Sequence, residues 1–113
     1  MSADQLLFSY GTLQHRDVQL DTFGRVPRSD EDVLPGYTVD YADIGDARVA
    51  GLSGLHVHPI VRETGSPRDK VTGVVLHLSE DEIDAADEYE VSLYRRVEAA
   101  LESGRTAWVY VTA

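Results

Sequence analysis

The 113-residue sequence contains no cysteine. Disulfide scaffolds, thiolate zinc sites and cysteine nucleophiles are therefore excluded. The longest apolar runs are only a few residues, so the sequence offers no helix long enough to span a bilayer. The start, Met1 to Gln5, lacks the basic residues and the long apolar stretch of a secretion signal. These absences lead us to expect a cytoplasmic protein with no membrane partner.

Basic residues are also scarce, because ten lysines and arginines stand against twenty acids and give a formal net charge of −10. A nucleic-acid-binding surface needs a basic face that contacts phosphates, so we expect no nucleic-acid partner. Any anionic substrate must be attracted by local donors, since the global field opposes it. The sequence does not indicate an oligomeric state.

What remains is the composition of one globular domain, 42% hydrophobic and 27% charged. A chain of this length can bury one core and is too short for two ordinary ones. No repeat, low-complexity block or linker interrupts it. We therefore expect a single domain over residues 1–113.

Strand-like segments outnumber helical ones. Apolar runs, β-branched residues and alternation predict strands over 5–10, 37–41, part of 51–61, 71–78, 94–101 and 106–111. A short helix is expected over 14–23, closed by Gly24. The acidic run Ser29–Asp32 is expected to be a solvated loop. Strands that cluster instead of alternating with helices favour an α+β fold with a mixed, barrel-like sheet and one or two short helices.

The second helix has the clearest start. Ser79 is a good N-cap and Glu82 stands three residues later, which makes a capping box, while Leu78 and Ile83 occupy the positions of a hydrophobic staple. We expect this helix to run from about Glu80 to about Glu88.

The tetrapeptide Tyr10-Gly11-Thr12-Leu13 directly follows the first predicted strand. Glycine lets a ligand approach the main chain closely. A strand that ends in such a turn can direct several backbone N–H groups at one spot, which suits an anion or a polarised carbonyl. The same tetrapeptide is also typical of an ordinary turn.

Glu90 is the candidate acid/base residue. We expect it just past the second helix, beside the apolar side chains of Tyr89, Val91 and Leu93. Partial desolvation raises the pKa of a carboxyl group toward the range useful for proton transfer at neutral pH. The alternative is an exposed acid in an acidic stretch.

Four segments occur in a characteristic order: Phe8–Leu13, Val71–Val75, Asp87–Glu90 with Tyr94–Val97, and Ala107–Tyr110. Through them the chain resembles, over nearly its whole length, the gamma-glutamylcyclotransferase-like superfamily, in particular its small AIG2-like branch. The resemblance implies a mixed α/β barrel with the glycine turn at the mouth of a cavity. It also implies an enzyme of the acyltransferase or lyase type that needs no metal or organic cofactor. Such an enzyme cyclises the γ-glutamyl group of a small amine or peptide to 5-oxoproline and releases the amine.

The resemblance also implies residue roles. The main-chain amides of the turn Tyr10–Leu13 hold the glutamyl part of the substrate. The family pattern is close to Asp-x-(Tyr/Gln)-Glu-Gly, which puts the catalytic glutamate at Glu90. Tyr94 matches a tyrosine that borders the cavity.

Two departures from the family pattern bear on the substrate. Val91 stands where the pattern has glycine, and Asp43-Ile44-Gly45 is a substitute for a Pro-Gly pair expected after the second strand region. Glutathione, a γ-glutamyl amino acid and a γ-glutamylamine all remain compatible. The departure at Val91 also allows a second function, a catalytically silent small-molecule-binding or regulatory module of the same fold.

Several of these residues also have ordinary structural explanations. Tyr10 and Tyr94 are as consistent with packing as with ligand contact. Thr12 can cap the helix that follows the turn. Arg95 and Arg96 can bind a carboxylate, or one of them can balance the acidic helix.

The remaining signals are weak. His56 and His58 share a face if residues 55–60 form a strand, but zinc needs further ligands and no metal site is expected. His77 is isolated. No serine lies in a Gly-x-Ser-x-Gly context, which disfavours serine-hydrolase chemistry.

Overall fold

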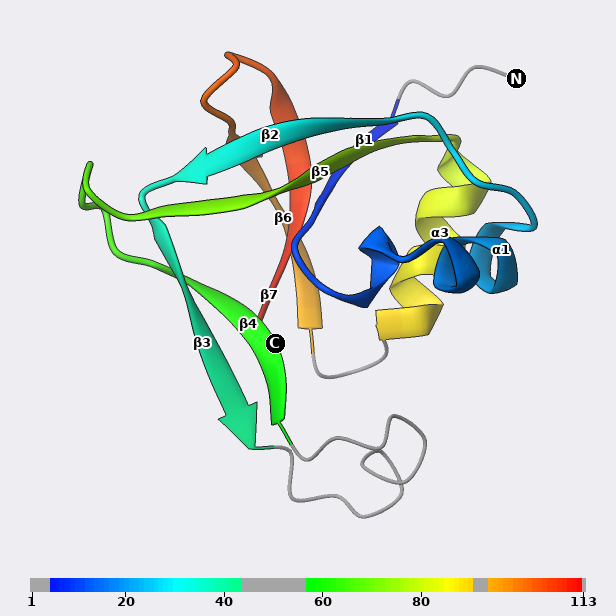
Figure 1. Ribbon diagram of the computed structural model, residues 1–113, viewed down its shortest axis with the longest axis horizontal. Helices are drawn as coiled ribbons and strands as arrows, with labels where there is room; N and C mark the ends of the chain where they lie inside the picture. Colours follow the sequence, from blue (N-terminus) through cyan, green and yellow to red (C-terminus); the bar gives the residue numbers. More distant parts are fainter. Residues whose placement is uncertain (1–4, 44–56, 91–93, 113) are drawn as a thin grey trace.

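The computed structural model describes residues 5–43, 57–90 and 94–112 (Figure 1). The strands are β1 (Gln5–Ser9), β2 (Ser29–Pro35), β3 (Tyr37–Asp43), β4 (Val57–Glu63), β5 (Lys70–Leu78), β6 (Tyr94–Ala100) and β7 (Thr106–Thr112). The helices are the 3₁₀ turn η1 (Thr12–Gln14) and the α-helices α1 (Arg16–Phe23) and α3 (Glu80–Glu90). Residues Ile44, Gly45, His56 and Val91, and the first part of the strand expected within 51–61, lie outside the described residues.

The strands form one mixed sheet in the order β2-β5-β1-β7-β4-β3, with β6 also paired to β7. β1 and β4 run parallel to β7, and the other pairs are antiparallel. Because β6 occupies one edge of β7, β1 and β4 share the other edge. β1 pairs with Trp108 and Val109, and β4 pairs with Val111. The mixed sheet with two short α-helices confirms the α+β expectation.

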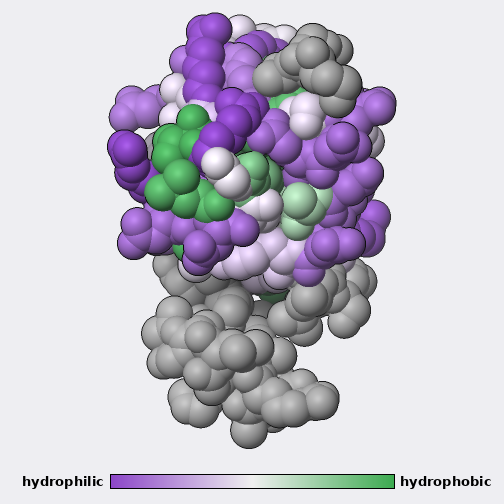
Figure 2. All heavy atoms as spheres, turned by 90° about the vertical axis from the view of Figure 1, so that its right-hand side faces the viewer, coloured by the Kyte–Doolittle hydropathy of each residue, from purple (hydrophilic) through white to green (hydrophobic). Residues whose placement is uncertain are grey.

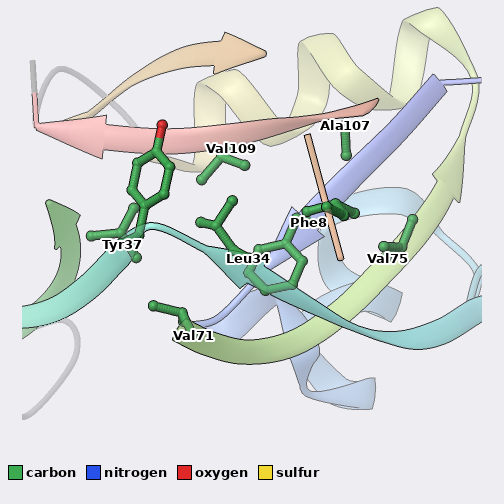
Figure 3. Close-up of a cluster of buried hydrophobic side chains, with 9 residues drawn as sticks. Phe8, Leu34, Tyr37, Val71, Val75, Ala107 and Val109 are labelled. Atoms are coloured by element: carbon green, nitrogen blue, oxygen red, sulfur yellow. The ribbon is translucent and has the colours of Figure 1, made fainter. Parts of the chain in front are cut away.

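Successive side chains of β7 serve two different cores, because side chains alternate along a strand. Val109 lies in the interior of the curled sheet, near Phe8 and Leu34 (Figure 3). Tyr110 packs on the opposite face, in the core that the sheet forms with the helices.

Local signals indicate where α3 begins and where α1 ends. The Glu82 carboxylate accepts the Ser79 amide at 2.9 Å and the Glu82 amide donates to the Ser79 hydroxyl at 3.2 Å, which confirms the capping box. Arg25 binds the same carboxylate through two contacts of 2.7 Å. Helix α1 ends at Gly24, whose φ of 75° is left-handed. Among the described residues, no helix is long and apolar enough to cross a membrane.

The two α-helices lie together on one side of the molecule (Figure 1). Figure 2 looks onto this side, which is largely hydrophilic with one compact apolar patch. Leu20 of α1 and Val26, which follows it, are large apolar residues that remain exposed.

The expectation of a solvated loop over the acidic run was wrong. Residues 29–35 form β2, which pairs with β5 from Ser29 opposite Leu76 to Pro35 opposite Lys70. Gly36, with φ of 80°, then turns the chain into β3. Pro35, the last residue of β2, and Gly36 therefore form a Pro-Gly pair at the end of the second strand, earlier than Asp43.

The acids of β2 are tolerated because the β6–β7 hairpin supplies their partners. The buried carboxylate of Asp32 accepts hydrogen bonds from the Ser103 hydroxyl at 2.6 Å and from Arg105 at 2.9 Å. Arg105 also donates to Asp30 at 3.2 Å, and Asp30 shares a hydrogen bond of 2.7 Å with His77. These contacts fasten β2 to β5 and to the hairpin.

The same contacts lower two carboxyl pKa values. The hydrogen bond with His77, followed by the one from Arg105, lowers the pKa of Asp30. Burial alone would raise the pKa of Asp32. Hydrogen bonds from the Ser103 hydroxyl, backbone amides and Arg105 outweigh burial and hold that pKa below its usual value. At acidic pH the unfolded chain therefore binds more protons than the native protein.

We predict that the free energy of unfolding is constant from neutral pH down to about pH 5. Below about pH 4 it should fall, because Asp30 and Asp32, whose pKa values are lowered in the native protein, then become protonated. Asp32→Asn should flatten this acid dependence, as measured by thermal denaturation between pH 3 and pH 7. Glu31→Gln, an exposed neighbour on the same strand, is the control. An acid dependence that Asp32→Asn leaves intact would contradict this assignment.

Gly73 of β5 is required by the close approach of β1. A Cβ at this position would collide with the carbonyl oxygen of Ser9 and lie 2.8 Å from the Phe8 ring. Both obstacles resist movement, because one is backbone and the other belongs to a fully buried ring. This contact explains a glycine in the middle of a β-branched strand.

We predict that Gly73→Ala lowers the free energy of unfolding by about 2 kcal/mol or more through overpacking. Urea denaturation measures this loss. Thr72→Ala, at the exposed neighbouring position, is the control and should cost much less. Equal losses in the two variants would show that the approach of β1 is not the constraint.

Candidate functional site

The glycine turn and the end of α3 lie against each other. The hydroxyl groups of Thr12 and Tyr89 share a hydrogen bond of 2.6 Å, although the residues are 77 positions apart. Tyr89 directly precedes Glu90 in the sequence. The fold therefore brings together the two segments on which the sequence argument concentrated.

Tyr10 closes a gap in the sheet at the point where β1 leaves β7 and β4 joins it. Its hydroxyl donates to the carbonyl oxygen of Tyr110 at 2.6 Å. Tyr110 lies between Val109, which is the last residue of β7 that pairs with β1, and Val111, which pairs with β4. The Tyr10 ring packs against the interior core. Tyr10 thus has a structural role at the start of the glycine turn.

Tyr110 connects the same place to α3. Its hydroxyl donates to one carboxylate oxygen of Asp87 at 2.7 Å, and the Arg96 guanidinium lies 3.1 Å from the other. Arg96 is stacked over the Trp108 ring, with its guanidinium carbon 4.3 Å from the ring centroid. Arg96 Nε is buried and finds no acceptor in the described part of the chain. Arg96 therefore balances the acidic helix, which was one of the two alternatives for the arginine pair.

A hollow of about 460 Å³ opens between the end of α3 and the β6–β7 hairpin. Its lining residues are Asp87, Tyr94, Arg95, Arg96, Trp108 and Tyr110. The rings of Tyr94 and Tyr110 meet edge to face, with centroids 6.4 Å apart. Tyr94 therefore contributes both to packing and to the wall of a hollow.

Glu90 is the last residue of α3, so the helix runs two residues beyond its expected end and includes this residue. The structure describes the backbone of Glu90 and not its side chain. Positions 87 and 90 are three residues apart, a spacing that makes them neighbours on a helix surface. The role of the Glu90 carboxyl group stays a prediction.

The backbone of the turn leaves donors available. The amide of Gln14 donates to the Gly11 carbonyl oxygen at 3.1 Å, and the amide of His15 donates to the Thr12 carbonyl oxygen at 2.9 Å. By contrast, the amides of Gly11, Thr12 and Leu13 donate to no acceptor within residues 5–43, 57–90 and 94–112. N–H groups without an intramolecular acceptor are the donors that an oxyanion or a carboxylate requires.

The side chain of Leu13 does not face a ligand, and that of Thr12 does not cap a helix. The Leu13 side chain is buried in the core between helices and sheet, so only its main chain can face a ligand. Thr12 does not cap a helix, because the N-cap residues of η1 and α1 are Gly11 and His15, and neither cap makes a side-chain hydrogen bond. Its hydroxyl contacts Tyr89 instead.

Asp87, Trp108 and Tyr110 belong to the motifs in the sequence, but the sequence predicts no role for them at the site. Alternation along β7 puts Trp108 and Tyr110 on one face, whereas no sequence signal pairs Tyr110 with Asp87. Among the residues whose side chains are described, no group of three or more histidines and acids is arranged to hold a metal ion.

A sequence model of the family described as "Gamma-glutamyl cyclotransferase, AIG2-like" matches residues 7–113. No curated protein matches the chain.

Solved structures share the fold. The Arabidopsis thaliana protein At5g39720.1 superposes with a TM-score of 0.74 at 22% identity, covering 99% of this chain and 73% of that one. The uncharacterized protein loc79017 from Homo sapiens gives 0.71 at 18% identity, with 96% and 66% covered. A structure named gamma-glutamyl cyclotransferase gives 0.68 at 19% identity, also with 96% and 66% covered. The chain thus spans about two thirds of the length of the last two.

We predict that Tyr10→Phe lowers the free energy of unfolding by about 1–2 kcal/mol, because it keeps the ring and removes the donor to the Tyr110 carbonyl. Urea denaturation measures the change. A variant as stable as the wild type would show that the hydroxyl does not hold this part of the sheet.

Proposed function

The chain belongs to the gamma-glutamyl cyclotransferase, AIG2-like family, and we propose that it converts a small γ-glutamyl amine or peptide into 5-oxoproline and a free amine. The observation that carries the proposal is the hydrogen bond between Thr12 and Tyr89. It holds the turn with its available amides beside the helical residue that precedes Glu90. This contact supports the proposal that the turn anchors the substrate and that the neighbouring Glu90 transfers the proton.

The reaction is an intramolecular aminolysis. The α-amine of the γ-glutamyl group attacks the side-chain carbonyl of the same molecule, the five-membered lactam closes, and the bond from that carbonyl to the leaving nitrogen breaks. Because both reacting groups belong to one molecule, the site needs chiefly to hold the substrate in its folded, reactive shape. Glu90 removes a proton from the ammonium group and delivers it to the leaving nitrogen.

The glycine turn supplies the electrostatic part of the mechanism. The amides of Gly11, Thr12 and Leu13 bind either the developing oxyanion or the α-carboxylate of the substrate. A protein with a formal net charge of −10 needs such local donors to hold an anionic group. Tyr94, which lines the neighbouring hollow, borders the substrate.

We predict that Glu90→Gln lowers the rate of 5-oxoproline formation by about a hundredfold or more, because the amide keeps the shape of the side chain and cannot transfer the proton. The assay incubates the protein with γ-glutamyl amino acids, glutathione and γ-glutamylamines and detects 5-oxoproline by mass spectrometry. Glu88→Gln, an exposed acid on the same helical turn, is the control and should keep the wild-type rate.

Turnover by Glu90→Gln at the wild-type rate would contradict the proposed mechanism. A compound that raises the melting temperature of the wild-type protein and yields no 5-oxoproline would favour the binding or regulatory module instead.

A further inference from the structure

We propose that Asp87 and Tyr89 are positioning residues, which fix the last turn of α3 and thereby aim residue 90 between the β6–β7 hairpin and the glycine turn. The catalytic consequence of this arrangement rests on the proposed function. The mechanical part, a helix end held at two points, rests on the contacts alone.

Asp87 is the anchor to the hairpin. Both of its carboxylate oxygens are engaged, one by the Tyr110 hydroxyl at 2.7 Å and the other by Arg96 at 3.1 Å. Neither partner is free to follow the helix, because Tyr110 is 6% exposed and Arg96 is stacked on Trp108. A change in the position of α3 would therefore break these contacts.

Tyr89 is the anchor to the glycine turn. Its side chain is among the large apolar groups left exposed, at 41%, so burial does not determine where the ring lies. What restrains it at its far end is the hydrogen bond of its hydroxyl with Thr12. That contact links the helix to the segment whose amides are proposed to hold the substrate.

The two anchors act on opposite sides of α3. Each helical residue turns the chain by about 100°, so positions 87 and 89 point about 200° apart and restrain rotation about the helix axis. Position 90 lies about 100° beyond 89 and about 60° short of 87, in the arc between them. Position 90 thus lies between the two anchored positions on the helix surface.

The test compares Asp87→Asn and Tyr89→Phe with Asp84→Asn, a matched control that makes the same change at an exposed position one turn earlier. Since a displacement of about 1 Å can cost about a hundredfold in rate, we expect each positioning variant to lower kcat by about ten- to a hundredfold. KM should stay within about threefold of the wild-type value. If both variants keep the kcat of Asp84→Asn, the positioning role is wrong.

Amide hydrogen exchange over residues 86–90 tests the anchors without any substrate. Asp87→Asn and Tyr89→Phe should speed exchange in this turn, and Asp84→Asn should not. Unchanged exchange in both variants would overturn the proposal. Failure of the proposed function is distinguishable, because the wild-type protein would then form no 5-oxoproline while exchange still reports on the anchors.

Discussion

The site depends on the two polar groups of Tyr110. Its carbonyl oxygen accepts the Tyr10 hydroxyl, and its own hydroxyl donates to Asp87. One buried residue of a central strand therefore holds the start of the glycine turn on one side and the end of α3 on the other. Because a buried polar group without a partner costs free energy, these contacts define one arrangement of the three elements.

The split pairing of β7 explains why such a residue is needed. β1 pairs with the first half of one edge of β7 and then turns away, and β4 takes up the second half. A chain that leaves a sheet must satisfy the backbone groups it abandons. Tyr10 does so with a side chain, which frees the residues that follow, Gly11 to Leu13, to present their own amides.

Local signals predicted most of the fold. The capping box at Ser79 and the left-handed Gly24 act within a few residues, so a sequence suffices to find them. β2 was missed because its acids disfavour strands and their partners are remote: Arg105 stands 75 residues after Asp30. The site shows the same division. Motif resemblance selected the turn and Tyr94, whereas the contacts of Asp87 with Tyr110 and of Thr12 with Tyr89 follow only from the folded chain.

We propose that the glycine turn and the end of α3 form two walls of one site. A crystal structure of the protein with 5-oxoproline would test this arrangement. We expect the lactam between these walls, with its carbonyl or carboxylate oxygens about 3 Å from the amides of Gly11 to Leu13 and the Glu90 carboxyl group at its nitrogen. A lactam bound elsewhere, or a Glu90 side chain directed away from the turn in that complex, would rule this arrangement out.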